Sequence, residues 1–243
     1  MIERKDLDKG GSIMTIQERL ASYVTTTNFN AFTPEVVQDA KKLLLDYLGV
    51  TFAGKNAEGC RSIVELVKEM GARGSSTVIG HNFKSQPNLA AMANSAMGHA
   101  WDFDDTHDAA VLHTSVCAVP VALAIGEKIN SSGKDLLTSI ILGVDVHSRL
   151  GLGCKSGPFD SGWSYVSMLG IFGAISTACK LLNLNESQIS NAIGIGYSMS
   201  SGNVQTVVDG ALIKRMQPGF SVSSGIISTL LAVKCRSTRL LAR

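Results

Sequence analysis

Apolar residues recur with a helical period along most of the chain. The clearest segment begins at Thr33, which can cap a helix, and Pro34, which favours the first helical position. From there to about Phe52, apolar and charged side chains fall on opposite faces (apolar Val36, Ala40, Leu43 and Tyr47; charged Lys41, Lys42 and Asp46). Gly54 stands where a C-terminal cap is expected, so the pattern predicts a helix over residues 34–52.

The same reasoning predicts further helices at about 15–27, 57–71, 88–101, 116–130, 134–150, 164–183, 186–200 and 219–234. Asn185 and Gln188 have the spacing of a capping box, and only residues 76–80 resemble a strand. Several of the 24 glycines fall inside helical segments, where close helix packing must offset their low helix propensity. The sequence therefore predicts an all-α fold with a compact multi-helix core rather than a simple bundle.

Composition narrows the class of protein. The 243 residues are 45% hydrophobic and 17% charged with a formal net charge of +2, which argues against disorder and nucleic-acid binding. The five cysteines form no CxxC pair, which fits neither a disulfide framework nor a zinc site. The N-terminus has no apolar secretion signal, and the apolar stretches at 116–126 and 225–233 are shorter than a membrane span of roughly 18 to 20 residues. We expect a cytoplasmic protein that binds neither nucleic acid nor membrane.

Candidate chemistry is concentrated in residues 99–115, HAWDFDDTHDAAVLHTS. The segment holds four carboxylates and three histidines (Asp102, Asp104, Asp105 and Asp108; His99, His107 and His113). Carboxylates crowded into a partly buried site have raised pKa values or attract a positive partner, and both outcomes suit acid/base catalysis. For any single one of these side chains, capping of the helix near Val116 or exposure to solvent is an equally good explanation.

Two metal-dependent alternatives fit parts of this segment. Residues 104–108 match the DDxxD motif that holds magnesium and diphosphate in all-α isoprenoid synthases, but the chain has no second acidic motif and only 6% aromatic residues. The spacing of Asp104, His107 and His113 permits a metal site without demanding one. We therefore predict no bound metal.

Two other groups of polar residues stand outside this segment. Lys214 and Arg215 precede a Pro-Gly turn that leads into a helix; the pair suits a carboxylate ligand, although a solvated loop explains it as well. His147 falls on an apolar stripe and is expected to be a hydrogen-bonded core histidine, with Asp145 and Arg149 forming an i,i+4 pair beside it.

Taken in order, five segments resemble the MmgE/PrpD family, whose members include 2-methylcitrate dehydratase, cis-aconitate decarboxylase and iminodisuccinate epimerase. They are LLLDYLGVTFAG at 43–54, ANSAMGHAWDFDDTH at 93–107, HTSVCAVPVALAIGE at 113–127, GVDVHSRLG at 143–151 and IKRMQPGFSVSSGIISTLLA at 213–232. The resemblance runs from about 15 to 233. It implies the family's all-helical domain, a homodimer formed through that domain, and chemistry on a small polycarboxylate without a cofactor.

The resemblance also implies roles for individual residues. Asp102 and His113 correspond to an acid/base pair, Thr106 to a substrate hydrogen-bonding residue, and Lys214 to the cation that holds a substrate carboxylate. His107 and Arg215 join Thr106 and Lys214 as predicted substrate-binding residues. The implied reaction is a lyase reaction, the loss of water or carbon dioxide from a di- or tricarboxylate such as 2-methylcitrate or cis-aconitate. Epimerisation of an amino- or imino-dicarboxylate, and a non-catalytic helical dimerisation or binding module, remain alternatives.

Two features depart from the family pattern. Ser164 follows a Gly-Trp pair where members commonly have a histidine, and a serine does not titrate near neutral pH. The family's second α+β domain is also missing, and residues 234–243, which carry four cations and no acid, match no hinge of the family. Without these ten residues the net charge is −2. We predict a flexible extension over 1–13, the helical domain over 14–233, and over 234–243 the tail of a truncated or out-of-frame product with impaired turnover.

Overall fold

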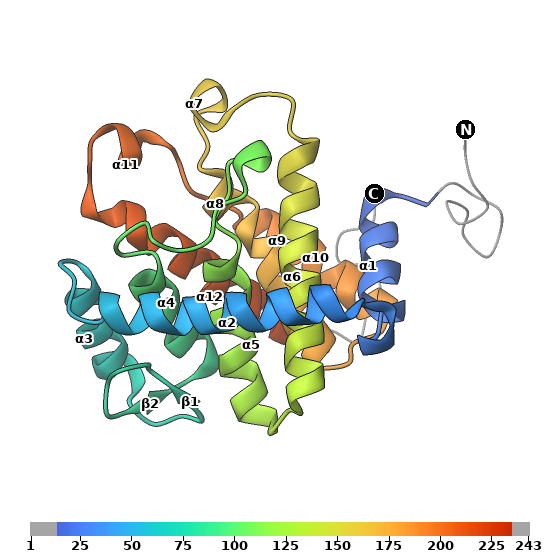
Figure 1. Ribbon diagram of the computed structural model, residues 1–243, viewed down its shortest axis with the longest axis horizontal. Helices are drawn as coiled ribbons and strands as arrows, with labels where there is room; N and C mark the ends of the chain where they lie inside the picture. Colours follow the sequence, from blue (N-terminus) through green and yellow to red (C-terminus); the bar gives the residue numbers. More distant parts are fainter. Residues whose placement is uncertain (1–13, 235–243) are drawn as a thin grey trace.

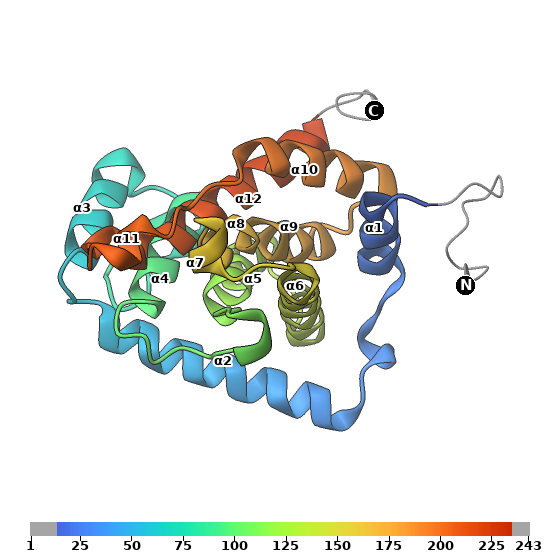
Figure 2. The same cartoon turned by 90° about the horizontal axis from the view of Figure 1, so that it is seen from above.

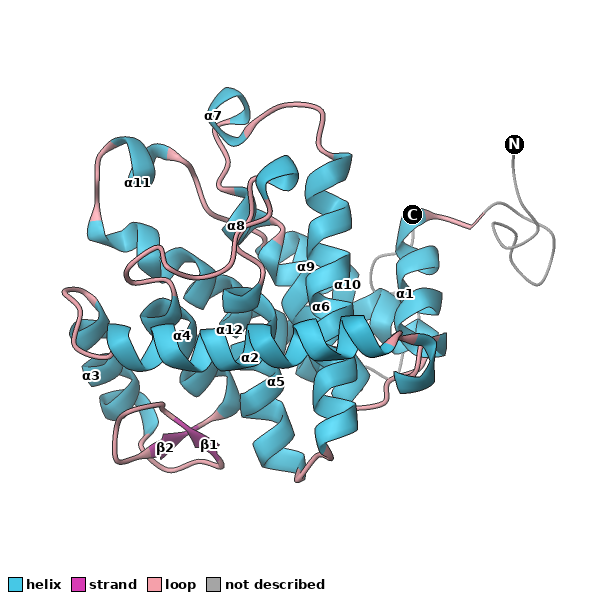
Figure 3. Ribbon diagram, in the orientation of Figure 1, coloured by secondary structure: helices cyan, strands magenta, loops and turns pink. Residues whose placement is uncertain are grey.

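A computed structural model describes residues 14–234, almost all of them in helices and the turns between them (Figure 1). The longer helices are α1 (Ile16–Thr26), α2 (Pro34–Gly54), α3 (Cys60–Gly71), α4 (Pro87–Gly98), α5 (Ser115–Ile129), α6 (Gly133–Gly153), α9 (Gly170–Leu181), α10 (Glu186–Met199) and α12 (Gln217–Lys234). The shorter helices are α7 (Pro158–Ser161), α8 (Tyr165–Met168) and α11 (Gln205–Val208), with 3-10 turns η2 (Phe29–Ala31), η3 (Asp108–Ala110) and η4 (Leu212–Met216). The strands β1 (Ser76–Thr77) and β2 (Lys84–Ser85) form one small antiparallel pair (Figure 3). The predicted all-α class is confirmed.

The helices enclose a central group formed by α4, α5, α6 and α9. Viewed from above, α2 runs along one side of this group, and α10 and α12 lie on the opposite side (Figure 2). The largest core cluster draws apolar side chains from both sides and from the centre (among them Tyr47, Val119, Ile125, Ile140, Ala174 and Ile226). Burial of these side chains holds together helices that are far apart in the sequence.

The helix starts are set locally by side-chain caps. The Thr33 hydroxyl accepts the amide hydrogen of Val36, and Pro34 occupies the first turn of α2 as predicted. The predicted capping box of α10 is confirmed, because Asn185 and Gln188 each accept the other's backbone amide. Polar side chains at these positions satisfy amides that a helix start would otherwise leave unpaired.

Three local predictions differ from the structure. The helix predicted over 164–183 is broken into α8 and α9, because the Ser167 and Met168 carbonyls accept the hydroxyls of Ser221 and Ser200 from other parts of the chain. Helix α2 continues through Gly54, which therefore does not act as a cap beyond its end. The strand predicted over 76–80 shrinks to two residues, and its equally short partner β2 has too little sequence to carry an alternating pattern.

Gly54 allows the end of α2 to contact the end of α4. A Cβ atom placed on it would lie 2.0 Å from the Met97 carbonyl oxygen, which is backbone and cannot turn aside. We expect Gly54→Ala to lower the free energy of unfolding by about 1 to 3 kcal/mol, the usual cost of overpacking. Gly49→Ala is the matched control in the same helix: a Cβ there meets nothing within 4 Å, and we expect stabilisation of up to about 1 kcal/mol. Urea unfolding measures both changes, and a loss of the same size in both variants contradicts the packing argument.

Two helical stretches, Gly133–Gly153 and Leu212–Lys234, are long and apolar enough to cross a membrane by length and composition. Both instead supply side chains to the protein core, including Ile140 and Leu142 of α6 and Val222 and Ile226 of α12. A core helix passes the same length test, so these stretches are explained by packing within the helical domain.

His147 lies on α6 in the core, as predicted, but its hydrogen bonding is incomplete. Its Nε2 atom is 3.3 Å from the Tyr165 carbonyl oxygen, while Nδ1 is buried without a partner among the described residues. Complete burial lowers the pKa of His147 from 6.5 to about 4, because the loss of hydration outweighs the opposing effects of the Tyr165 carbonyl and the Asp105 charge. The predicted pair of Asp145 and Arg149 is confirmed at 2.6 Å.

The lowered pKa of His147 predicts a loss of stability in acid. Between pH 6.5 and 4 the unfolded chain binds a proton at this histidine that the folded chain does not. The free energy of unfolding should therefore decrease as the pH is lowered from 6.5 to 4, by at most about 3 kcal/mol. In His147→Gln the pH dependence measured by urea unfolding should become shallower, with a residual slope from His99, whose pKa burial also lowers. An unchanged slope contradicts this assignment.

Candidate active site

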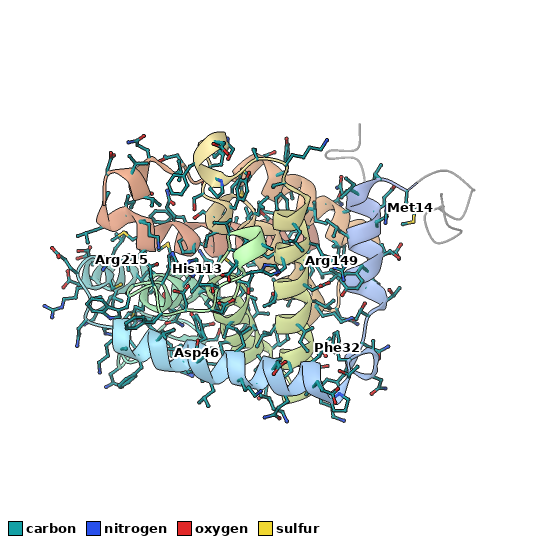
Figure 4. The ribbon with its side chains drawn as sticks, turned by 45° about the horizontal axis from the view of Figure 1, so that its top comes forward. Met14, Phe32, Asp46, His113, Arg149 and Arg215 are labelled. Carbon is teal, nitrogen blue, oxygen red and sulfur yellow. The ribbon has the colours of Figure 1, made fainter. Side chains whose placement is uncertain are left out.

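A cavity of about 390 Å³ lies among residues 99–113, the segment around α7 and α8, and the segment from α11 to the start of α12. We call the main polar lining residues the polar wall (His99, Thr106, His107, Asp108, His113 and Lys214) and the main apolar ones the apolar wall (Val111, Phe159, Val166, Val204 and Val207). Figure 4 shows His113 in the interior of the helical assembly, between its ends. The size and the few convergent polar groups suit a small ligand with both charged and hydrocarbon parts.

Asp104 lies beneath this cavity, between two histidines. Its side chain is fully buried, and its Oδ2 atom is 2.9 Å from His99 Nδ1 and 3.1 Å from His113 Nδ1. Burial acts to raise the pKa of Asp104, but the close contact with His113, the hydrogen bond from His99 and the charges of both rings outweigh it and hold the pKa well below its ordinary value. The carboxylate is therefore ionised throughout the neutral range.

The two histidines respond differently to the same carboxylate. Burial dominates at His99, so its pKa is lowered despite the hydrogen bond to Asp104. At His113 burial is weaker, and the close contact with the charged Asp104 carboxylate raises the pKa. Environments that separate the pKa values of neighbouring groups are characteristic of acid/base sites. His99 is the neutral member of the pair, and His113 carries a proton more readily.

Asp102 and Lys214 form an ion pair at the edge of the site, although 112 residues separate them. Asp102 has a positive φ of 52°, and its carboxylate is 57% exposed. Lys214 comes from η4, is largely buried and lines the cavity. Among the described residues it is the only lysine or arginine in the lining, so it is the cation available to a carboxylate ligand there.

Asp105 has a structural role. Its two oxygens accept hydrogen bonds from the amides of Thr114 and Ser115 and from the Thr114 hydroxyl, at 2.6 to 3.1 Å. These bonds cap the start of α5 and hold the backbone directly after His113. The alternative explanation of capping therefore applies to this carboxylate. Of the other three carboxylates of the segment, Asp108 lines the cavity, and Asp102 and Asp104 contact residues that line it.

Comparison with known proteins agrees with the all-helical fold. A family model described as the MmgE/PrpD N-terminal domain matches residues 18–234. The chain belongs to the MmgE/PrpD family. Cis-aconitate decarboxylase of Aspergillus terreus is 30% identical over 82% of this chain and 41% of its own length. Cis-aconitate decarboxylase of Mus musculus is 28% identical over 91% of this chain and 46% of its own. The chain thus spans slightly under half the length of the curated relatives it matches.

Of the other predicted site residues of this MmgE/PrpD domain, two line the cavity and one does not. Thr106 and His107 line the cavity, and His107 Nδ1 accepts the Ala110 amide at the start of η3. Arg215 does not line it: the guanidinium donates to the Glu58 carbonyl, and Figure 4 shows Arg215 toward the α3 end of the molecule. The role of Arg215 in substrate binding stays a prediction that its position does not favour.

The metal-ligating set considered from the sequence is not assembled. Among the described residues, the potential ligands that lie within 4.8 Å of one another are His99, Asp104 and His113, without His107. In this cluster the Asp104 carboxylate accepts a hydrogen bond from His99 and lies 3.1 Å from His113 Nδ1, so the three side chains contact one another directly.

Ser164 lines the cavity where the family resemblance implies a histidine. Its amide donates to the Gly202 carbonyl, which fixes the chain just before α8. The hydroxyl can hydrogen-bond a ligand but does not titrate near neutral pH. Of the two histidines His107 and His113, which both line the cavity, His113 contacts a buried carboxylate, that of Asp104.

Sequence reasoning missed two features of this MmgE/PrpD site. The first is the contact of His99 and His113 with one oxygen of Asp104, which their separation by five and nine residues in an irregular segment did not reveal. The second is the apolar wall, formed partly by Val204 and Val207 beyond α10. Helix α11, which contains Val207, is too short for its sequence to show a helical period, so the sequence could not predict its position.

Proposed function

We propose that this chain carries the proton-transfer and carboxylate-binding groups of a lyase that uses no cofactor and acts on a small di- or tricarboxylate. The observation that supports this most strongly is the meeting of His113, backed by Asp104, with Lys214, paired to Asp102, at one polar wall. The cis-aconitate decarboxylases among the relatives make that substrate and 2-methylcitrate the first candidates.

The charge of each group determines its proposed role in the reaction. Lys214 binds a substrate carboxylate, and its positive charge stabilises electrons that accumulate on the adjacent carbon. In a decarboxylation, carbon dioxide leaves with its bonding electrons remaining on the substrate, and protonated His113 delivers a proton to the carbon that receives them. In a dehydration, Asp102 removes a proton next to a carboxylate while His113 protonates the departing hydroxyl, which leaves as water. The apolar wall accommodates the hydrocarbon part of the substrate.

Incubation of the full chain with cis-aconitate or 2-methylcitrate in heavy water, followed by NMR, tests the proposal. We expect slow loss of carbon dioxide or water together with incorporation of deuterium. Incorporation without loss of either group indicates an epimerase, and thermal stabilisation by the ligand without exchange indicates a binding module. Neither stabilisation nor exchange with any di- or tricarboxylate contradicts the proposal.

We also propose that the protein is a cytoplasmic homodimer associated through this helical domain. Leu45 and Phe52 on the outer side of α2 are 73% and 55% exposed, and Leu48 between them is partly exposed on the same helical face. A contiguous apolar stripe of this kind favours contact with another protein surface. Sedimentation over a range of concentrations should give a dimer for the native chain, while Leu45→Lys should shift it toward monomer. A native chain that stays monomeric contradicts the proposal.

A further inference from the structure

The buried carboxylate of Asp104 has a position that substrate binding does not explain. It does not line the cavity, and its side chain is shielded from solvent, whereas both neighbouring histidines line the cavity wall. The rings of His99 and His113 meet edge to face with centroids 4.8 Å apart, and the Nδ1 atom of each lies close to the same Asp104 oxygen. Burial of an ionised carboxylate costs free energy unless neighbouring groups compensate its charge.

We infer that Asp104 and His99 are a positioning pair for His113: His99 fixes the Asp104 carboxylate, and the carboxylate orients the His113 ring and favours its protonated form. This inference rests on the proposed function only in assigning His113 as the group that transfers a proton to substrate. The coupling between the three side chains is a property of the protein itself and can be measured without substrate.

The hydrogen-bond geometry supports the direction of this arrangement. His99 is almost completely buried, and its Nδ1 lies 2.9 Å from Asp104 Oδ2, so the neutral ring donates its single Nδ1 proton to the carboxylate. His113 Nδ1 faces the same oxygen at 3.1 Å, but its ring is turned away from the line of a hydrogen bond. The two atoms are close enough to form an ion pair when His113 is protonated. His113 is 20% exposed, and its Nε2, on the other side of the ring, is then the nitrogen available to a ligand in the cavity.

The second oxygen of Asp104 indicates that the carboxylate is held for His113. Oδ1 is buried and accepts no hydrogen bond from any described residue. A carboxylate that served only to anchor the chain would be expected to use both oxygens, as Asp105 does with the amides at the start of α5. Asp104 instead contacts two imidazoles. Because no described residue donates a hydrogen bond to its Oδ1 atom, less of the negative charge of the carboxylate is neutralised by other groups.

The other charged and titratable groups around His113 do not replace Asp104. On the cavity side Lys214 lowers the pKa of His113 and Asp102 raises it, and these two opposed charges are paired with each other. On the buried side the titratable neighbours are uncharged at neutral pH or already bonded: Tyr47 and Cys117 have pKa values raised by burial, His147 has a lowered pKa, and Asp105 is held by α5. Among these groups, Asp104 is the carboxylate in direct contact with the His113 ring.

Titration of the histidine side chains by NMR tests the inference on the full chain without ligand. The sequence has five histidines, and the His113 signal is assigned by its loss in His113→Asn. We expect Asp104→Asn to lower the pKa of His113 by about one unit or more, because an opposite charge at this distance shifts a pKa by about 1 to 3 units. His81, which lies at a separate surface depression near α3, should titrate unchanged and reports that the fold is intact. An unchanged pKa of His113 in a folded Asp104→Asn variant overturns the inference.

Two substitutions of His99 separate positioning from packing. Asparagine presents an N–H group near the place of Nδ1 and should retain the hydrogen bond to Asp104, whereas phenylalanine keeps the ring but offers no donor. We expect His99→Asn to leave the pKa of His113 close to that of the native chain. His99→Phe should change this pKa and alter the ¹⁵N shifts that report which ring nitrogen of His113 carries the proton. Equal effects of the two substitutions would show that His99 serves only to fill space.

These results are distinguishable from failure of the proposed function. If no polycarboxylate is turned over but Asp104→Asn still lowers the pKa of His113, the positioning pair stands and the reaction assignment falls. If turnover is observed, the pH profile of kcat/KM should move in Asp104→Asn in the same direction as the pKa of His113. A uniformly lower profile that keeps its shape would indicate a structural role for Asp104 alone.

Discussion

Replacement of His113 by asparagine is expected to reduce the rate of proton exchange or turnover by about 10²- to 10⁴-fold, the contribution usual for a positioned acid or base. The asparagine amide can approximate the contact with Asp104 but cannot transfer a proton at neutral pH. His113 lines the cavity, is partly exposed, and is the histidine whose pKa the Asp104 carboxylate raises. The change is measured as the initial rate of deuterium incorporation into cis-aconitate or its product.

His81→Asn is the matched control for this substitution. His81 is also a partly exposed histidine, but it lines a separate surface depression beside Arg61 and Lys68 of α3. Its replacement should change the rate less than twofold to threefold, within the scatter of surface substitutions. Comparable losses in both variants would mean that neither histidine is specific to the reaction.

Replacement of Lys214 by methionine should weaken binding of cis-aconitate by about tenfold to a hundredfold, because a hydrogen bond between charged groups contributes about 1.5 to 3 kcal/mol. Methionine keeps the length of the side chain and removes its charge. Asp102 then loses its partner and repels the incoming carboxylate, which adds to the loss of affinity. Calorimetric titration of the full chain with cis-aconitate gives the dissociation constant directly.

Arg215→Met makes the same change in charge one residue along the chain. Because the Arg215 guanidinium contacts the Glu58 carbonyl and does not line the cavity, the dissociation constant should change less than twofold to threefold. An Arg215→Met effect as large as that of Lys214→Met would restore the sequence-based assignment of Arg215 to substrate binding. It would also show that the local charge of η4, rather than a specific contact of Lys214, attracts the ligand.

Helix positions were predictable because their signals are local. Caps such as Thr33 and Asn185 lie within four residues of the amides they bind, and the apolar faces of α2 and α10 follow from the helical period. The interruption at Leu169 was not predictable, because the Ser200 and Ser221 hydroxyls that take the neighbouring carbonyls come from distant parts of the chain.

The chemically active segment was also evident in the sequence, but the roles within it were not. Four carboxylates close together predicted a site without distinguishing Asp104, which faces two histidines, from Asp105, which caps a helix. The two differ by one position in the sequence and by the direction in which the backbone turns each side chain. That direction follows from the path of residues 99–114, where Asp102 adopts a positive φ.

By itself the sequence determined the all-helical class, the location of most helices, the resemblance to the MmgE/PrpD family and the two segments that meet at the site. These follow from periodicity, capping and residue type, which act over a few positions. Only the tertiary structure decided that Lys214 rather than Arg215 faces the cavity, that Asp104 lies between His99 and His113, and that apolar side chains from distant segments also line the cavity. Such contacts depend on where helices distant in sequence come to rest, because burial brings them together without regard to their separation along the chain.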